Sequence, residues 1–511
     1  MSDIEATLSR EADALLTGAE RAAAEFVDYD RERVARIVRA VAEAALEHAE
    51  SLAVRAVEET GFGVLADKVL KNETIAKTFL EEYAESNYCD QRIDSQKRML
   101  LIPRPAGVVL GITPSTSPIA AVCYKVLCAL LTRNAIVISP HPGAKRVCTD
   151  TAQILARAAE QAGAPRNVVQ VLPEPSIPVV EAMMADDRVK LVIATGGGAV
   201  VRAAYRSGTP AIGVGPGNSP VVVDETADLK QVAEKLIRSK SYDNGVLCTT
   251  ESVLIAVDSI APRLVKLLTA KGAHLCSATE TQRLREYMFP GGKFNTKVVG
   301  RDAAVIAAEA GFSVPKQTKV LIAPIESTHG NEVLTHEKLS PVLAYLAAPD
   351  FSRATAAARQ ILDVTGIGHS AAIHSENAQR VLDYSFALPV HRIAVNVPAS
   401  LGNAGIGTYL PVSMSLGTGY IGGSSSSENL NPDHFVQWSS VAYSTNIFDK
   451  FPDFAELRRS SVGARPESGG TADVDAEAIA AALAPELRGA LGRDDLRRIV
   501  REELRDLIGA R

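Results

Sequence analysis

The sequence has no long apolar segment and no basic excess. No apolar run among its 511 residues reaches the roughly 18 residues that a membrane-spanning helix needs, so a membrane is not expected as a partner. The 54 Lys and Arg residues are outnumbered by 60 Asp and Glu residues, which gives a formal net charge of −6. Nucleic-acid-binding proteins carry a basic surface, so nucleic acid is not an expected partner either. With 46% hydrophobic residues the chain is too apolar to be disordered and predicts large buried cores.

Cysteine and histidine are also scarce, and neither forms a recognisable framework. The six cysteines include no Cys-x-x-Cys pair, and the nine histidines form no His-Glu-x-x-His or similar set, so no metal site is expected. In a chain of this length such cysteines are most simply reduced, either buried or catalytic, which predicts a cytoplasmic protein. The acidic amino-terminal stretch lacks the basic and apolar regions of a secretory signal. The cysteines are Cys89, Cys123, Cys128, Cys148, Cys248 and Cys276.

Two patterns divide the body of the chain. Residues 3–86 are predicted to be almost wholly helical, because apolar residues recur at helical spacing, as between Asp30 and Val57, where there is no proline. From about residue 97, short and continuously apolar runs alternate with helical segments. Such runs are typical of parallel strands that are covered on both faces and joined by right-handed crossovers. The sequence therefore predicts an α/β fold, with one alternating set ending near residue 224 and a second over residues 225–415.

The composition changes sharply after these sets. Residues 459–475 have the Ser, Gly, Pro and charge content of a flexible linker. Residues 476–511 are predicted to be helical again, and within them Asp494–Ile508 places apolar side chains on one helical face and arginines on the other. The apolar stripe consists of Leu496, Ile499, Val500, Leu504, Leu507 and Ile508.

Cys248 is the most informative single residue. It follows an Asn-Gly turn signal and precedes an apolar run, which places its thiol at a junction between loop and strand, where it can face a cleft. A buried, inert cysteine is the alternative. Two glycine-dense turns accompany it, at residues 195–198 and 212–220. The first follows an apolar run and opens a helix, so it can present backbone N–H groups to a phosphate or a substrate.

These segments together resemble the aldehyde dehydrogenase superfamily, and in particular its CoA-acylating branch, which includes the aldehyde dehydrogenases of bacterial microcompartments. The resemblance spans roughly residues 1–445 and rests on several motifs. The matching stretches are residues 194–228 and 239–252, GVVLGITPSTSP at 107–118, TRNAIVISPHPGAK at 132–145, EKLSPV at 337–342, GIGHS at 366–370 and NVP at 396–398.

The resemblance implies a Rossmann-type cofactor domain, an α/β catalytic domain and an oligomerisation arm. The helical start and the dinucleotide-binding domain would occupy residues 1–224, and the catalytic domain residues 225–415. Residues 416–458 would return to the cofactor domain and the arm, to which a strand near residues 97–103 would also belong. A homodimer or homotetramer is implied.

The resemblance also implies the site residues. Cys248 falls on the family's nucleophile, and Glu337 falls on the glutamate that holds the nicotinamide ribose, although it could instead cap a turn. His369 is a candidate for a residue near the acyl centre that helps to deprotonate CoA or shapes the pocket; a histidine packed at a strand end is the alternative. The implied cofactor is NAD or NADP, with coenzyme A as co-substrate. The implied cofactor-binding positions are Ser139, His141, Pro142, Thr195, Gly196, Gly197 and Glu337.

Three departures separate this sequence from the hydrolytic members of the superfamily. Hydrolytic members carry a water-activating glutamate 34 residues before the nucleophile, and the matching residue here is Val214, which cannot accept a proton. They carry an oxyanion-binding asparagine where this sequence has Thr116, whose hydroxyl can act beside the Cys248 N–H. They carry lysine in place of His141 at the adenosine ribose. The nearby Lys145 and Arg146 are candidates for a dinucleotide phosphate or form the solvated start of a helix.

The implied reaction is the reversible, NAD(P)-dependent oxidation of a short-chain aldehyde to an acyl-CoA through a thioester on Cys248. A hydrolytic dehydrogenase that recruits another base is one alternative, and a nucleotide-binding scaffold protein without turnover is another. The carboxy-terminal segment resembles the encapsulation peptides of microcompartment enzymes. It implies a shell protein as a partner and a location inside a bacterial microcompartment, whereas packing on the protein's own oligomer and a small coiled-coil contact are the alternatives.

Overall fold

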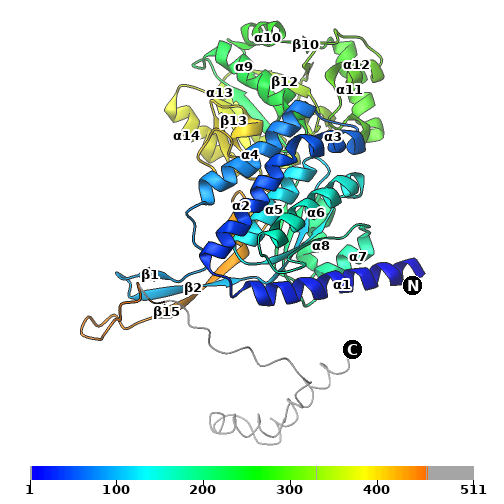
Figure 1. Cartoon of the computed structure of the whole chain (residues 1–511). Helices are drawn as coiled ribbons and strands as arrows, with labels where there is room; N and C mark the ends of the chain where they lie inside the picture. Colours follow the sequence, from blue (N-terminus) through cyan, green and yellow to red (C-terminus); the bar gives the residue numbers. More distant parts are fainter. Residues whose placement is uncertain (1–2, 330, 456, 458–511) are drawn as a thin grey trace, which may run out of the picture. The chain divides into compact units, whose positions relative to one another are not determined.

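The computed structural model describes residues 3–329, 331–455 and 457 (Figure 1). The expected linker at 459–475 and the expected tail at 476–511 lie outside the described residues. The chain divides into two units, Met1–Pro452 and Asp453–Arg511, and every described helix and strand belongs to the first. Within the described part, no helix combines the length and the apolar character that crossing a bilayer takes.

Four helices form the amino-terminal part of the first unit. Their amphipathic faces turn inward, as α2 illustrates: its apolar residues between Val34 and Ala45 are buried at helical spacing, and the Asp30 side chain caps it by accepting a bond from the Arg33 N–H at 2.8 Å. Helical structure was predicted for this segment. The helices are α1 (Asp3–Phe26), α2 (Arg31–Glu47), α3 (Ala49–Thr60) and α4 (Leu65–Tyr83).

A five-stranded parallel sheet follows, in the order β5-β4-β3-β6-β7. The chain runs from β3 to β4 and β5 on one side, and from β6 to β7 on the other, so the carboxyl ends of β3 and β6 form a topological switch point, where open α/β sheets bind ligands. The strands are β3 (Val108–Ile112), β4 (Ala135–Ser139), β5 (Val169–Val171), β6 (Val189–Thr195) and β7 (Ala211–Val214). The connecting helices are α5 (Pro118–Leu131), η1 (Pro142–Ala144), α6 (Lys145–Gln161), α7 (Ile177–Met184) and α8 (Gly198–Arg206).

A second parallel sheet has seven strands, in the order β10-β11-β12-β9-β8-β13-β14. One core packs α9 and α10 on one face of this sheet, and another packs α11 to α14 on the opposite face, which explains why β9 is buried at every residue. The strands are β8 (Ser219–Val223), β9 (Glu251–Val257), β10 (Ala273–Leu275), β11 (Val320–Pro324), β12 (Val342–Ala348), β13 (Ala371–His374) and β14 (Ile393–Val395). The helices are α9 (Leu229–Ser241), η2 (Tyr242–Gly245), α10 (Ala261–Ala270), α11 (Ala278–Met288), η3 (Pro290–Gly292), η4 (Thr296–Val298), α12 (Ala303–Glu309), η5 (Val333–Thr335), α13 (Phe351–Val364) and α14 (Ala378–Ala387).

Strand β8 pairs with β9 and β13, so it belongs to the second sheet, although the boundary expected at residue 224 places it with the first. Its uniformly apolar sequence fits either sheet equally well, and only the pairing of strands far apart in the chain decides between them. The domain boundaries as such stay a prediction. The parallel sheets and the α/β class agree with the predicted fold.

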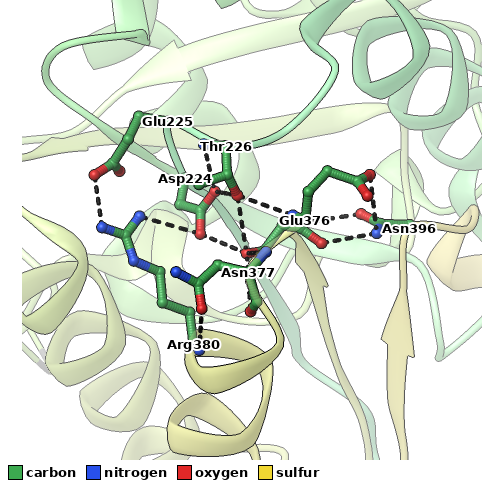
Figure 2. Close-up of polar contacts among 8 residues, drawn as sticks. Asp224, Glu225, Thr226, Glu376, Asn377, Arg380 and Asn396 are labelled. Atoms are coloured by element: carbon green, nitrogen blue, oxygen red, sulfur yellow. Dashed lines mark hydrogen bonds and ion pairs between the residues drawn. The ribbon is translucent and has the colours of Figure 1, made fainter.

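The second sheet also has a switch point, at the carboxyl ends of β8 and β13, but polar side chains fill it (Figure 2). Asp224, which is fully buried, accepts a bond from the Ser375 hydroxyl at 2.6 Å and pairs with Arg380 at 3.2 Å. Arg380 also pairs with Glu225 at 2.6 Å. Asn396 donates to the Ser375 carbonyl and accepts from the Ser375 N–H, which ties the end of β14 to this network. This network therefore links the ends of β8, β13 and β14.

The third sheet is antiparallel and has the order β1-β2-β15. It joins β1 (Arg92–Asp94) and β2 (Met99–Pro105), which follow the four amino-terminal helices, to β15 (Val436–Ala442) near the end of the first unit, and these strands form one ribbon that extends from the body (Figure 1). The strand expected near residues 97–103 and the returning segment expected after residue 416 meet here. The remaining short elements are α15 (Ala399–Gly402), η6 (Tyr420–Gly422) and η7 (Pro432–Phe435).

Candidate active site

A cavity of about 500 Å³ lies at the switch point of the five-stranded sheet and extends to Cys248. It lies at the carboxyl ends of β3, β4, β6 and β7 and is closed by loops from the second sheet. Of the site residues predicted from the sequence, all line it except His369 and the two candidate phosphate contacts, Lys145 and Arg146. The main segments of its wall are residues 112–117, 139–142, 175–177, 195–197, 214–216, 246–249 and 413–414.

Cys248 lies between η2 and β9 and is partly exposed to this cavity. Burial raises the pKa of its thiol to about 12, and the nearby Glu337 carboxylate adds to this rise. The Arg392 cation and the backbone N–H groups of Cys248 and Thr249 oppose it by favouring the thiolate. The side chain is therefore a thiol at neutral pH in the unliganded site. Its activation must come from a neighbouring base or from a bound positive charge.

Glu337 is a candidate for such a base. It lies on the cavity wall just after η5, and burial raises its pKa to about 8, while a bond from the Gly217 N–H lowers it. A carboxyl group with this pKa exchanges its proton near neutral pH, as a general base needs. The charge of Glu337 also acts on the Cys248 thiol, so the two side chains lie within electrostatic range of each other.

The loop between β7 and β8 approaches the nucleophile so closely that it requires a glycine. A Cβ atom built on Gly217 would lie 2.0 Å from the Cys248 carbonyl oxygen and 3.2 Å from its Cβ. Any side chain there would push the two loops apart. Val214 begins this loop at the end of β7 and lies on the cavity wall with 4% of its surface exposed. The hydrolytic base position is thus occupied by a buried apolar group.

Arg392 lies within electrostatic range of Cys248 and bonds to the backbone of His369. Arg392 is buried and donates to the carbonyls of His369 (2.9 Å), Gly417 (2.7 Å) and Ser427 (2.6 Å), and burial lowers its pKa to about 10. The His369 ring is fully buried and bonded through Nδ1 to the Ser370 hydroxyl at 2.8 Å. Burial, with the Arg392 charge, lowers its pKa to about 3. The fold thus holds His369 neutral and away from the cavity wall, and its expected role at the acyl centre stays a prediction.

The opposite end of the cavity has the features of a dinucleotide site. Thr195 ends β6, and Gly196 and Gly197 follow it and lead into the amino terminus of α8, whose N–H groups and dipole favour an anion. Ser139 ends β4, Pro142 begins η1, and His141 between them caps η1 by accepting a bond from the Gly143 N–H. The sheet switch point, the glycine turn and the helix terminus together fit a nicotinamide dinucleotide. Lys145 does not line this cavity and pairs instead with Glu174 at 2.6 Å.

Sequence reasoning missed several buried cations near the cavity, and Lys125 and Arg392 are two of them. Lys125 is fully buried in α5, donates to the hydroxyls of Thr195 (2.9 Å) and Ser415 (3.1 Å), and has its pKa lowered by burial to about 7. A signal for it exists, because it is the only charged residue in a helix of 14 residues that is otherwise almost wholly apolar. Arg392 has no such local signal, since its partners lie in other segments of the chain.

A cluster of three potential metal ligands lies at β10 and the start of α11, outside the residues that line the cavity. It consists of His274, Cys276 and Glu280. Their ligand atoms all lie within 4.8 Å of one another. The spacing of these three residues matches neither the Cys-x-x-Cys nor the His-Glu-x-x-His motif, so the sequence did not predict the cluster. Glu280 accepts from the Ser277 N–H at 2.7 Å within the capping box of α11 and contacts the His274 ring at 3.2 Å. The requirements of the helix cap therefore account for one of the three positions, Glu280.

Comparison with known proteins gives a family and several relatives. The family model described as the aldehyde dehydrogenase family matches residues 1–284. The bifunctional aldehyde-alcohol dehydrogenase of Escherichia coli K12 is 37% identical over 465 residues, which are 88% of this chain and 52% of that protein. The chain thus spans about half the length of this relative. Succinate-semialdehyde dehydrogenase (acetylating) of Clostridium kluyveri is 34% identical over 84% of this chain and 94% of its own length. Sulfoacetaldehyde dehydrogenase (acylating) of Cupriavidus necator is 34% identical over 87% and 91%.

Three solved structures also resemble this chain. An acetylating aldehyde dehydrogenase from Geobacillus thermoglucosidasius has a TM-score of 0.86 and 34% identity, covering 88% of this chain and all of that one. A propionaldehyde dehydrogenase from the fucose-utilisation microcompartment of Clostridium phytofermentans has a TM-score of 0.77 and 27% identity, covering 85% and 98%. A propionaldehyde dehydrogenase from Rhodopseudomonas palustris with bound CoA and an acylated cysteine has a TM-score of 0.75 and 26% identity, covering 84% and 97%.

Proposed function

Because this chain belongs to the aldehyde dehydrogenase family, we propose that it oxidises a short, uncharged aldehyde to an acyl-CoA with NAD, through a thioester on Cys248. The main support for this proposal is the set of residues that the cavity wall brings together. It brings a cysteine to one end and a dinucleotide-binding crevice to the other, and it has a buried valine at the position of the hydrolytic base. The cysteine of the Rhodopseudomonas palustris structure is likewise acylated in the presence of CoA.

In the first half of the reaction the Cys248 thiol loses its proton to Glu337, which lines the same cavity and whose charge acts on the thiol, and the sulfur forms a bond to the aldehyde carbon. The backbone N–H of Cys248 and the Thr116 hydroxyl stabilise the developing oxyanion. When bound, the nicotinamide accepts the hydride that leaves this carbon. Cys248 then holds the acyl group as a thioester, which is at the oxidation level of a carboxylic acid.

In the second half the thioester needs a nucleophile. Val214 supplies no proton acceptor, so water is not activated from that position. The thiol of CoA forms a new bond to the acyl carbon, and the Cys248 sulfur leaves as a thiolate that regains its proton. One thioester replaces another, so the step is close to isoenergetic and the overall reaction is reversible. Hydrolysis is the second candidate function, because Glu337, with its pKa near 8, is a possible base for water.

The charges of the cavity wall support an uncharged aldehyde and NAD. Within the described part of the chain, the residues that line the cavity include the carboxylates Glu181 and Glu337 but no lysine or arginine. Succinate semialdehyde and sulfoacetaldehyde, named for two of the relatives, are anions, and no cationic side chain of the cavity wall would contact such an anion directly. The 2′-phosphate of NADP would also find no cationic side chain on the wall, because Lys145 pairs with Glu174 and does not line the cavity.

An aldehyde panel tests this proposal. Acetaldehyde, propionaldehyde, succinate semialdehyde and sulfoacetaldehyde would each be incubated with NAD or NADP, with and without CoA, and the product identified by mass spectrometry. We expect sustained turnover only with an uncharged aldehyde, NAD and CoA together, and acyl-CoA as the product. Free acid as the main product would favour the hydrolytic function, and a preference for the anionic aldehydes would contradict the proposed substrate class.

The carboxy-terminal segment supports a further part of the proposal, a microcompartment shell protein as partner. The support is the apolar stripe of residues 494–508 in the sequence, together with the origin of the Clostridium phytofermentans neighbour. Residues 485–511 fused to a fluorescent protein should be recruited to co-expressed shells, and Leu504→Glu in the stripe should weaken recruitment more than Arg498→Glu on the other face. Unchanged recruitment of the Leu504→Glu fusion would contradict shell docking through the stripe. We also propose that the chain forms a homodimer or homotetramer through the three-stranded arm.

A further inference from the structure

The turn just before Cys248 has an unusual backbone. Asp243, Asn244 and Gly245 follow one another at φ values of +47°, +54° and +70°. Asparagine and aspartate tolerate this left-handed region as single residues, but a non-glycine pair there is strained and persists only where its surroundings hold it. The strained turn ends three residues before the nucleophile.

Two buried lysines of α4 hold this turn. Asp243 is fully buried, and its Oδ2 atom lies 3.1 Å from Nζ of Lys68 and 2.8 Å from Nζ of Lys71, whose side chains are each only 2% exposed. Its Oδ1 atom accepts a bond from the Val64 N–H at 2.8 Å, at the start of α4. Asp67, on the first turn of α4, accepts a bond from the Asp243 N–H at 2.8 Å. A carboxylate with two cations and a helix terminus is a strong anchor in a buried environment.

The cluster of Lys68, Lys71 and Asp243 also contacts the loop that carries Thr116. Nζ of Lys71 also donates to the Ser117 hydroxyl at 3.1 Å, and Ser117 is the neighbour of Thr116 in the loop before α5. Lys71 therefore bonds at once to the loop that precedes Cys248 and to the loop that carries Thr116. On its far side the turn is fixed by Asn244, whose amide donates to the Gly300 carbonyl at 3.0 Å.

We propose that Lys71 and Asp243 are positioning residues that fix the separation between Cys248 and Thr116. The inference rests on the proposed function, in which these two groups act on the same aldehyde. Lys71 touches neither substrate nor cofactor, since it does not line the cavity. It acts through the turn at 243–245 and through Ser117. Without it the strained turn loses its shortest ion pair, and the two loops lose their common bond.

The informative variant is Lys71→Met, which keeps most of the side-chain volume and leaves Asp243 paired with Lys68. We expect kcat to fall between about tenfold and 100-fold, because a displacement near 1 Å between reacting groups costs about that much. The KM for NAD should stay within about twofold, because the dinucleotide crevice is built from other residues. The rate of Cys248 alkylation by iodoacetamide should change at least about fivefold. Lys71→Arg, which keeps a cationic donor, should restore part of kcat.

Arg380→Met is the matched control. It removes the partner of another fully buried carboxylate, Asp224, but at the carboxyl ends of β8 and β13, whereas Cys248 precedes the parallel strand β9 at the opposite edge of the sheet. It should lower the thermal midpoint, as Lys71→Met does, while kcat and the alkylation rate stay near wild type. Ser117→Ala removes only the bond to the Thr116 loop and should lower kcat without slowing alkylation.

The outcomes separate the inference from the proposed function. Wild-type kcat and alkylation in Lys71→Met would overturn the inference, and so would equal losses in Arg380→Met, which would show that stability alone decides activity. Alkylation does not depend on CoA. If wild type released free acid without CoA while Lys71→Met still altered alkylation, the proposed function would fail and the positioning of Cys248 by Lys71 would stand.

Discussion

Substitution of Gly217 by alanine offers a sharp test of how the cavity is built, because the structure defines the perturbation closely. The added methyl group would lie 2.0 Å from the Cys248 carbonyl oxygen and 2.8 Å from its carbonyl carbon, where ordinary contacts begin at 3.4 Å. Both neighbours are backbone atoms that cannot rotate away. The φ angle of Gly217 is not in the left-handed region, so the effect arises from space and not from backbone strain.

The magnitude follows from the displacement that relieves this contact. A shift of more than 1 Å is needed between the loop at 215–218 and Cys248. A misplacement of about 1 Å costs about 100-fold in rate, or about 2.7 kcal/mol of transition-state stabilisation. We therefore expect Gly217→Ala to lower kcat about 100-fold at saturating aldehyde, NAD and CoA.

Steady-state NADH formation measures this loss, and Gly215→Ala is the matched comparison in the same loop. A methyl group on Gly215 would meet no atom closer than 3.9 Å, so its effect should fall mainly on the KM for NAD and be far smaller in kcat. Thermal unfolding of both variants shows whether the fold is kept. A folded Gly217→Ala enzyme with kcat within about threefold of wild type would refute the reasoning.

Three further outcomes are expected. Cys248→Ala should abolish NADH formation and keep NAD binding, whereas Cys123→Ala should stay active; turnover in the first variant would remove Cys248 as the nucleophile. Because the pKa of the Cys248 thiol is raised to about 12, its alkylation rate in the free enzyme should rise about tenfold per pH unit between pH 7 and 9 as the thiolate fraction grows, and a plateau below pH 9 would contradict that shift. Val214→Glu should add a carboxylate to the cavity wall and give CoA-independent release of free acid; acyl-CoA as its sole product would show that this position does not govern water activation.

The sequence carried enough local information to predict the α/β class and most of the cavity wall. Continuous apolar runs indicate doubly covered strands, and the glycine turn at 195–198 lies where a helix opens onto the crevice. Gly217 belongs to a motif that was recognised, but the reason for the glycine, its contact with Cys248, appears only in three dimensions.

The parts that could not be predicted depend on contacts between distant segments. Lys71 and Asp243 are separated by 172 residues, and neither has a local pattern that points to the other. The sheet to which β8 belongs depends on its pairing with β13, about 150 residues further along the chain. The burial of His369 is decided by Arg392 and the loops that Arg392 binds. A motif places a histidine near a site, but only packing decides whether it reaches the cavity.

The most direct measurement is a rapid-mixing experiment on the enzyme with NAD and an uncharged aldehyde in the absence of CoA. A valine at the base position leaves the thioester on Cys248 without activated water, so NADH should appear as a burst of about one equivalent per site and then nearly stop. Addition of CoA should restart turnover and release acyl-CoA. Continued NADH formation at the full rate without CoA, with free acid as the product, would contradict an acylating enzyme.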